Sequence, residues 1–281
     1  MNRLFIRQLL QQALLEDIGP RDITTELLFD ADAEIQAVLI AKAAGRIAGL
    51  LVVEEIFRLL DDRVRLIPLV SEGNDVDAGT PLATIRGSAR AVLSAERVAL
   101  NLLQRMSGIA TATRDVVRLT TPYRVQIADT RKTPPGLRLL DKYAVALGGG
   151  VNHRFGLYDA VLIKDTHIAA AGSITEAVRR IRQGIGHVTK IQVEVETLEQ
   201  VKEALALDID ALLLDNMAPD TLRQAVALAR GRVVTEASGG ITPDNIREYA
   251  ATGVDVISLG WLTHSVKALD ISLKVDSQIT K

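Results

Sequence analysis

Hydrophobic and polar positions follow different rhythms in the two parts of the chain. From about residue 125 onward, apolar runs of strand length alternate with longer runs whose apolar positions recur at helical spacing. Short, nearly continuous apolar strands separated by helices are typical of parallel strands buried on both faces. This part of the chain therefore predicts an α/β fold.

Six strands are predicted in this part, and helical patterns lie between them. The strands are 125–129, 160–164, 191–195, 211–215, 232–236 and 254–260, and the helices include 175–183, 198–207, 219–230 and 243–251. Ser173, Asp220 and Thr242 are the predicted helix caps. Six such units favour an α/β barrel, complete or partly open, over a doubly wound sheet. No GxGxxG motif opens the first strand–helix turn, which weakens a dinucleotide-binding interpretation.

The earlier part of the chain mixes helices and strands and predicts a small separate domain. A helical pattern runs from Leu4 and ends at Gly19-Pro20. A strand at 37–41, a helix at 50–60 and several turn-punctuated strands between 64 and 87 follow. A longer helix is predicted from 88 to 106, ending before Ser107-Gly108.

Composition excludes several classes of function. The net charge is −2 and only 3% of residues are aromatic, so neither a polyanion-binding surface nor a base-stacking platform is indicated. The chain has no cysteine, which excludes disulfides and thiolate chemistry. No apolar run approaches the roughly 18 residues of a membrane span. We expect no nucleic-acid partner, no membrane association and a cytoplasmic location.

One segment is strongly basic despite the neutral total. Cations outnumber acids six to two between residues 131 and 164. The cations are Arg131, Lys132, Arg138, Lys142, Arg154 and Lys164, and His153 lies among them. A solvated basic face is the ordinary interpretation of such a run. A small, highly anionic ligand is the alternative, and the position of the segment in the fold favours it.

Polar residues end nearly every predicted strand of the barrel. These ends carry Asp129-Thr130-Arg131-Lys132, Lys164-Asp165, Glu194 with Glu196, Asp215-Asn216, Glu236 to Gly240, and Gly260. Catalytic groups of parallel βα barrels lie at the carboxyl ends of the strands. Charges at so many strand ends predict one convergent site.

Two features of that rim indicate the kind of ligand. Ser238-Gly239-Gly240 and Gly260 can let backbone N–H groups approach a phosphate, with a helix predicted to begin near Thr242-Pro243. Glu194 and Asp215 end adjacent strands and supply oxygen ligands suited to Mg²⁺. Together with the cations, they describe a phosphorylated sugar that carries a diphosphate.

At these residues the sequence resembles the quinolinate phosphoribosyltransferases. The matching segments are Asp129–Arg138, Lys142–Val145, Gly148–Asp165, Val193–Glu196, Leu214–Met217, Glu236–Ile241 and Leu262–Asp270. Earlier matches are Glu16–Gly19, Asp22–Thr25, Glu96–Arg97 and Leu100–Gly108. The resemblance covers essentially the whole chain. Trp261 departs from it, since a small residue is usual there.

The resemblance implies a reaction and a fold. Quinolinate and phosphoribosyl pyrophosphate would give nicotinate mononucleotide, pyrophosphate and CO2, with Mg²⁺ as cofactor, in NAD biosynthesis. An N-terminal α/β sandwich domain, residues 1–108, is expected to precede an incomplete parallel α/β barrel, residues 109–268. Residues 269–281 are expected to return to the first domain. The protein is expected to be a homodimer with shared active sites, or a hexamer.

The resemblance also assigns roles to individual residues. Catalytic roles fall on Lys132, Glu194 and Asp215, and Glu194 and Asp215 are also the metal ligands. Substrate contacts are expected from Arg97 of a neighbouring subunit, Thr130, Arg131, Lys132, His153, Arg154 and Lys164. Phosphate contacts are expected from Ser238, Gly239, Gly240 and Gly260. Arginine forks suit the two carboxylates of quinolinate, and no covalent nucleophile is required.

Three other functions compete with this interpretation. Lys164 at a strand end could form a Schiff base in an aldolase, which borohydride trapping with a sugar phosphate would reveal. A catalytically silent anion sensor would bind the same ligands without turnover. A transferase that uses nicotinate itself is the nearest rival, and the surplus of cations argues for the dicarboxylate.

Overall fold

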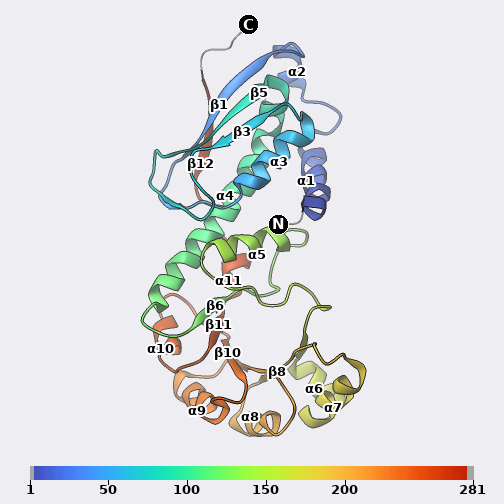
Figure 1. The fold of residues 1–281 in the computed structure, drawn as a ribbon, viewed down its shortest axis with the longest axis vertical. Helices are drawn as coiled ribbons and strands as arrows, with labels where there is room; N and C mark the ends of the chain where they lie inside the picture. Colours follow the sequence, from blue (N-terminus) through green and yellow to red (C-terminus); the bar gives the residue numbers. More distant parts are fainter. Residues whose placement is uncertain (1–2, 277–281) are drawn as a thin grey trace. The chain divides into compact units, whose positions relative to one another are not determined.

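The computed structural model describes residues 3–276, which form two compact units. Within the described residues, the first unit contains the chain up to residue 114, residues 134–148 and the chain from residue 265 onward. The second unit contains residues 115–133 and 149–264. Figure 1 shows the elements of both units.

The first unit is built on a four-stranded antiparallel sheet in the order β12-β1-β5-β3. Its strands are β1 (Glu34–Ala41), β3 (Arg65–Pro68), β5 (Pro81–Ser88) and β12 (Ile271–Val275). A ribbon of β2 (Gly45–Arg46) and β4 (Asp75–Val76) accompanies it. Every second residue of β1 is buried, as expected for a sheet with one face on a core.

Five helices of the described chain belong wholly or partly to this unit. They are α1 (Arg3–Ile18), α2 (Ile23–Leu28), α3 (Leu50–Leu60), α4 (Ala89–Thr120) and α5 (Arg138–Leu147). Side chains of α1, α3 and α4 share one hydrophobic core with β1 and β5. The expected layered α/β domain is therefore present.

The C-terminal segment pairs with the N-terminal sheet. Residues 271–275 of β12 run antiparallel to residues 37–41 of β1. The predicted return of 269–281 is thus seen for this strand, and residues 277–281 lie outside the described residues.

The predicted end of the long helix before Ser107-Gly108 is wrong, because α4 continues to Thr120. The Ser107 hydroxyl accepts a hydrogen bond from the Ala48 N–H (3.1 Å) and donates to the Ala48 carbonyl (3.2 Å). A Cβ on Gly108 would lie 2.2 Å from the Lys267 carbonyl oxygen. These two small residues serve close packing, and they do not terminate the helix.

The compact units differ from the predicted domains at two places. The boundary expected between residues 108 and 109 falls inside α4, and the unit changes after residue 114. Residues 134–148, expected in the barrel, pack in the first unit. There the fully buried Asp141 of α5 accepts two hydrogen bonds from Arg105 of α4, at 2.9 and 2.8 Å. This buried ion pair joins the two helices within one unit.

The second unit contains a six-stranded, wholly parallel sheet in the order β6-β11-β10-β9-β8-β7. Its strands are β6 (Gln126–Ala128), β7 (Val161–Ile163), β8 (Ile191–Val195), β9 (Ala211–Asp215), β10 (Val234–Ser238) and β11 (Val256–Ser258). In the described chain β6 and β7 stay edge strands, so the barrel is incomplete, as predicted. β10 begins and ends two residues later than expected, which places Ser238 within the strand.

Helices follow the strands as the periodicity predicted. They are α6 (Asp165–Ala171), α7 (Ile174–Gly184), α8 (Leu198–Leu205), α9 (Pro219–Ala229), α10 (Ile246–Ala250) and α11 (Trp261–His264). The Ser173 cap is confirmed, since its side chain accepts from the Glu176 N–H at 3.1 Å. The Asp220 cap is wrong, because Asp220 lies inside α9, which has Pro219 in its first turn.

The helix predicted from Pro243 begins only at Ile246. The Asn245 side chain accepts a hydrogen bond from the Thr242 N–H (2.8 Å), and residues 243–245 form a turn. An Asn that bonds nearby backbone in this way competes with helix formation. Thr242 is therefore not a helix cap.

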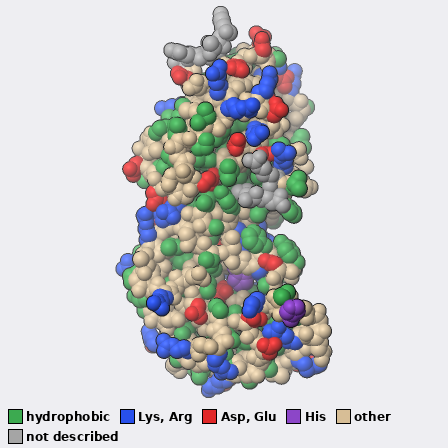
Figure 2. All heavy atoms as spheres, in the orientation of Figure 1, with side chains coloured by type: hydrophobic (Ala, Val, Ile, Leu, Met, Phe, Trp, Pro, Cys, Tyr) green, Lys and Arg blue, Asp and Glu red, His purple; other side chains and the backbone are tan. Residues whose placement is uncertain are grey.

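The visible surface of the second unit carries charges of both signs. On the face shown in Figure 2, Lys and Arg side chains are interspersed with Asp and Glu over its helices. This mixture agrees with the net charge of −2. Among the described residues, no helix is both long and apolar enough to span a membrane.

Replacing Gly108 by Ala should destabilise the protein although alanine is the better helix former. The new methyl group meets a backbone carbonyl, and such overpacking costs about 1–3 kcal/mol. Urea unfolding measures the effect. Gly184→Ala is the matched control: Gly184 ends α7 and has no atom within 4 Å of its Cβ position, so this variant should be neutral or stabilised. Equal stability of the two variants would contradict the close approach at Gly108.

Candidate active site

A cavity of about 370 Å³ lies at the carboxyl ends of the parallel strands, within the second unit. Its lining residues are Thr130, Arg131, Lys132, His153, Arg154, Leu162, Lys164, Glu194, Leu213, Asp215, Glu236, Ser238 and Ser258. The volume is in the usual range for small-molecule sites. The predicted convergence of strand ends is therefore present.

Strand parity explains which side chains reach this cavity. Side chains two residues apart on a strand point to the same face. Leu162 and Lys164, Leu213 and Asp215, and Glu236 and Ser238 are such lining pairs. The register aligns Glu194, Leu213 and Glu236 in one row across β8, β9 and β10. The alternation that buries the other face of each strand thus directs these groups inward.

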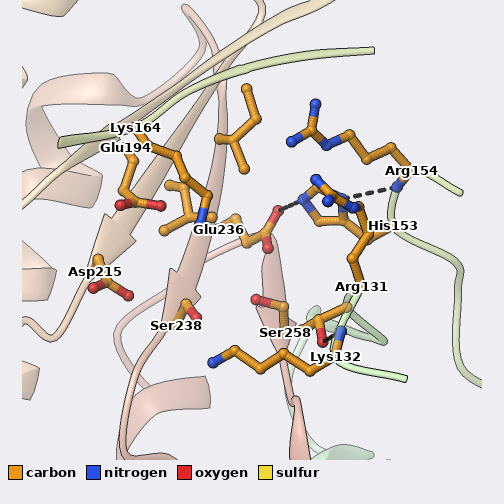
Figure 3. A pocket seen from close by; sticks show the side chains of 13 residues that line it. Arg131, Lys132, His153, Arg154, Lys164, Glu194, Asp215, Glu236, Ser238 and Ser258 are labelled. Carbon is orange, nitrogen blue, oxygen red and sulfur yellow. Dashed lines mark hydrogen bonds and ion pairs between the residues drawn. The ribbon is translucent and has the colours of Figure 1, made fainter. Parts of the chain in front are cut away.

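Two arginines and His153 form the positive side of the cavity. Figure 3 shows Arg131, His153 and Arg154 together, facing Glu194 and Asp215 across the cavity. Burial, and then the positive charge of Arg131, lower the pKa of Arg154. The Arg154 Nε is buried without a hydrogen-bond acceptor among the described residues. An anionic ligand would offset the charge repulsion between the two arginines.

His153 is held by the chain on both ring nitrogens. Its Nδ1 accepts a hydrogen bond from the Arg154 N–H (2.8 Å), and its Nε2 lies 3.0 Å from the Gln192 side-chain oxygen. Because Nδ1 is an acceptor, the ring hydrogen is on Nε2 and points to Gln192. The backbone N–H of His153 donates to the side chain of the fully buried Asp129 at 2.8 Å. This arrangement sets the path of the backbone at Arg154.

Gln192 and Glu236 support this side of the cavity; Glu236 was predicted at the rim without a role, and Gln192 was not predicted there. The Gln192 side-chain N–H donates to Glu236 Oε2 at 2.7 Å, and His153 Nε2 lies 3.6 Å from the same oxygen. A simple signal could have identified both, since they precede the predicted site residues Glu194 and Ser238 by two positions. Ser258, which also lines the cavity, likewise precedes a predicted site residue, Gly260, by two positions.

Glu194 and Asp215 form the negative side. Burial raises the pKa of both carboxyl groups, and Lys164 partly opposes the shift. Among the described residues, no group of three or more metal-ligating side chains occurs. A pair of carboxylates nevertheless fits Mg²⁺, which commonly binds one or two carboxylates and completes its shell with substrate phosphates and water.

Of the predicted phosphate-binding residues, Ser238 lines the cavity, whereas Gly239, Gly240 and Gly260 are not lining residues. Gly239 and Gly240 directly follow Ser238 and have positive φ angles of 95° and 63°. A Cβ on Gly260 would lie 2.9 Å from the Lys132 side chain, so glycine leaves space for that lysine. The Trp261 indole donates to the Ile241 carbonyl at 3.0 Å, which shows how the unusual tryptophan is accommodated.

Some residues from the charged segments do not line the cavity. Arg138 and Lys142 lie on α5 in the first unit, and Lys142 is fully buried there. Glu196 is exposed, and its N–H donates to the Gln200 side chain. Arg97 is exposed on α4, in the first unit, and is not a lining residue.

The fold and the cavity define an α/β-barrel protein with a cavity of charged side chains at the carboxyl ends of its strands. Two family models match the chain: the N-terminal domain of quinolinate phosphoribosyl transferase over residues 22–107, and its C-terminal domain over residues 109–274. The chain therefore belongs to the quinolinate phosphoribosyl transferase family.

Named relatives agree with this assignment over nearly the full length. A probable nicotinate-nucleotide pyrophosphorylase (carboxylating) of Bacillus subtilis is 50% identical, covering 98% of this chain and 95% of the relative. The crystal structure of NadC from Streptococcus pyogenes superposes with a TM-score of 0.93 at 41% identity, covering 98% and 97% of the two chains. A nicotinate-nucleotide pyrophosphorylase structure from Francisella tularensis has the same TM-score at 38% identity and covers 98% of each chain. These matches favour a transferase over the aldolase.

Glu194→Gln and Asp215→Asn should each raise the urea midpoint at pH 7. Because the folded-state pKa lies above the unfolded value, the ionised carboxylate lowers stability once the pH exceeds the folded pKa. The gain should shrink as the pH falls and the wild-type groups become protonated.

Glu176→Gln is the control with the opposite sign. Arg179 and Arg180 lower the pKa of Glu176 to about 2, so its charge stabilises the fold above the unfolded pKa and stops doing so in acid. This variant should lose stability at pH 7. If Glu194→Gln and Asp215→Asn also lose stability at pH 7, then ionised Glu194 and Asp215 do not destabilise the fold.

Proposed function

We propose that this protein transfers the phosphoribosyl group of phosphoribosyl pyrophosphate to quinolinate, with loss of CO2, giving nicotinate mononucleotide and pyrophosphate. This reaction belongs to NAD biosynthesis. The charges of the cavity are the main support for this proposal, because Arg131 and Arg154 lie opposite a pair of carboxylates in a chain of this family. A dianionic acceptor and a highly anionic donor suit such a distribution of charge.

The positive side is assigned to quinolinate. Arg131 and Arg154 offer forks that match its two carboxylates, and each charge-assisted bond contributes about 1.5–3 kcal/mol. Thr130, whose hydroxyl accepts from the Lys132 N–H at 3.0 Å, stays a predicted substrate contact. Since both ring nitrogens of His153 have protein partners, we assign it the positioning of Arg154.

The phosphoribosyl donor is assigned to the side of the cavity that carries Glu194 and Asp215, and to the glycines that follow Ser238. Lys132 and Lys164 are exposed at the rim and suit phosphate groups, and Ser238, Gly239, Gly240 and Gly260 suit the ribose phosphate. Glu194 and Asp215 would hold Mg²⁺, which neutralises the charge of the diphosphate when bound. The same two carboxylates stabilise positive charge on the ribose while pyrophosphate leaves.

The proposed transfer needs positioning and electrostatics, and it needs no covalent intermediate. The pyridine nitrogen attacks the ribose carbon as the bond to the pyrophosphate oxygen breaks. Cations aligned on the acceptor hold the nitrogen in place, which lowers the entropic cost of reaction. Fixed charges of the cavity stabilise the transition state without reorganisation.

We also propose that the functional unit is a homodimer with shared active sites. Arg97 supports this proposal, because it is exposed on α4 and absent from the cavity of its own chain. An arginine contributed by a neighbouring subunit would complete the carboxylate contacts. A hexamer of such dimers, and a cytoplasmic location, stay predictions.

Purified protein with quinolinate, phosphoribosyl pyrophosphate and Mg²⁺ should form nicotinate mononucleotide. Lys132→Ala and Arg154→Ala should each reduce kcat/KM by about 100-fold or more, because each removes a charge-assisted contact in a desolvated site. Chromatographic detection of the nucleotide is the measurement. Arg223→Ala, which removes an exposed arginine on α9, is the control and should keep full activity. Wild-type rates in both cavity variants would refute the assignment of the site.

Mixing Arg97→Ala with Lys132→Ala subunits should restore activity that each variant lacks alone. If sites are shared, a mixed dimer contains one site with both residues intact, and random mixing recovers about a quarter of the wild-type rate. Subunits are unfolded together, refolded and assayed. If a mixture that is shown to contain mixed dimers recovers no activity, a shared site is excluded.

A further inference from the structure

Glu236 is a buried carboxyl group that lines the cavity, and one of its oxygens has no hydrogen-bond partner among the described residues. Its side chain comes from β10 and the residue is 5% exposed. Oε2 accepts from Gln192 at 2.7 Å, whereas Oε1 is buried and has no hydrogen-bond partner among the described residues. Figure 3 shows the group between Lys164 and His153, inside the cavity. A buried polar atom left unbonded is costly, so Oε1 is expected to bond to the substrate.

The proposed reaction has a chemical requirement that the assigned residues do not meet. When CO2 leaves the pyridinium ring, the carbon–carbon bond breaks and its electron pair stays on the ring carbon beside the cationic nitrogen. A proton must then bind to that carbon to give the product. This inference therefore rests on the proposed function and identifies a proton donor within the same site.

The cationic side chains are poor candidates for that donor. Arg131 and Arg154 retain their protons in proteins. Lys132 and Lys164 are exposed at the rim, where the donor phosphates are assigned. None of the four groups is both buried and readily deprotonated.

The remaining titratable groups leave one candidate. The ring hydrogen of His153 points to Gln192, and its Nδ1 already accepts a hydrogen bond. Glu194 and Asp215 lie across the cavity from the positive side that is assigned to quinolinate. Glu236 lies on the His153 side, 3.6 Å from that ring, and is the most buried carboxyl group of the cavity.

We propose that Glu236 donates the proton that replaces CO2 on the pyridine ring. The groups facing it are Gln192 and His153, with Arg131, Arg154 and Lys164 elsewhere in the lining. A carboxyl oxygen that bonds to an anionic acceptor must carry the proton, because two carboxylate oxygens cannot form a hydrogen bond with each other. That proton moves from Oε1 to the ring carbon and forms the new C–H bond. The carboxylate that remains keeps the Gln192 N–H bond and the nearby cations.

A second cavity offers a route for the next proton. It has a volume of about 320 Å³ and shares His153, Arg154 and Glu236 with the active-site cavity. It extends past Ala211 to Lys190 and Asp210 at the amino ends of the strands. We infer that Glu236 regains its proton through this second cavity, since that route avoids the occupied active site.

Single-turnover kinetics of Glu236→Gln test this role. Pyrophosphate release reports phosphoribosyl transfer, and chromatography separates the dicarboxylate nucleotide from its decarboxylated product. General acids contribute about 10²–10⁴-fold, so product formation should slow by that factor while pyrophosphate release stays near the wild-type rate. The dicarboxylate nucleotide should accumulate, because an unprotonated carbanion recaptures CO2. Wild-type rates for both steps would overturn the proposal.

Isotope discrimination gives a readout that a purely structural role would not change. In an equal mixture of H2O and D2O, the ratio of hydrogen to deuterium at the new C–H position depends on the group that donates the proton. NMR of the product should show one ratio for the wild type and Glu236→Asp, and another for Glu236→Gln, in which water is the donor. The same ratio in all three proteins would overturn the proposal even if Glu236→Gln is slow.

Two controls separate this inference from the proposed function. Glu199→Gln removes an exposed carboxylate at the start of α8 and should leave both steps and the isotope ratio unchanged. If the wild type releases no pyrophosphate from the two substrates, the proposed function itself fails. If the wild type turns over and Glu236→Gln slows both steps equally, with an unchanged isotope ratio, the function stands and the proton donor is a different group.

Discussion

Positive charge crowded inside a half-buried cavity is the constraint on which the rest of this site depends. Burial and the adjacent Arg131 lower the pKa of Arg154, and its Nε has no acceptor among the described residues. Such an arrangement raises the energy of the ligand-free protein. It persists because the surrounding strands and the contacts of His153 hold the groups in place, and binding of an anion recovers the energy.

The parallel sheet makes this arrangement possible at small structural cost. Its strands bury one set of side chains against the outer helices and direct the alternate set into the barrel. Glu194, Leu213 and Glu236 occupy one row because the register of β8, β9 and β10 aligns them. Interior positions that would hold apolar side chains in a filled barrel instead hold carboxyl, amide and imidazole groups. The cavity at the carboxyl ends of the strands is consequently lined mainly by polar side chains.

The two arginines lie across the cavity from Glu194 and Asp215, and in the proposed reaction this arrangement lets one site handle two chemical steps. In the proposed reaction, the carboxylates of Glu194 and Asp215 face the ribose, where positive charge develops, and the arginines face the acceptor. Glu236 lies on the side of the arginines and accepts a hydrogen bond from Gln192. Charge separation over a short distance needs a rigid scaffold, since mobile side chains would neutralise one another as ion pairs.

Much of this could be predicted from the sequence, because it depends on local periodicity. The strands 191–195 and 211–215 and the helix 50–60 have the predicted limits, since continuous apolar runs bounded by polar residues define them. Most predicted site residues line the cavity, because strand ends of a parallel barrel must converge. The sequence by itself thus determined the barrel, the charged rim and the family. Only the tertiary structure decided the role of Ser107-Gly108, the assignment of 134–148 to the first unit, and the roles of Gln192 and Glu236. Each of these depends on contacts between residues far apart in the chain, such as Gly108 with Lys267 or Gln192 with Glu236, and periodicity carries no information about such contacts.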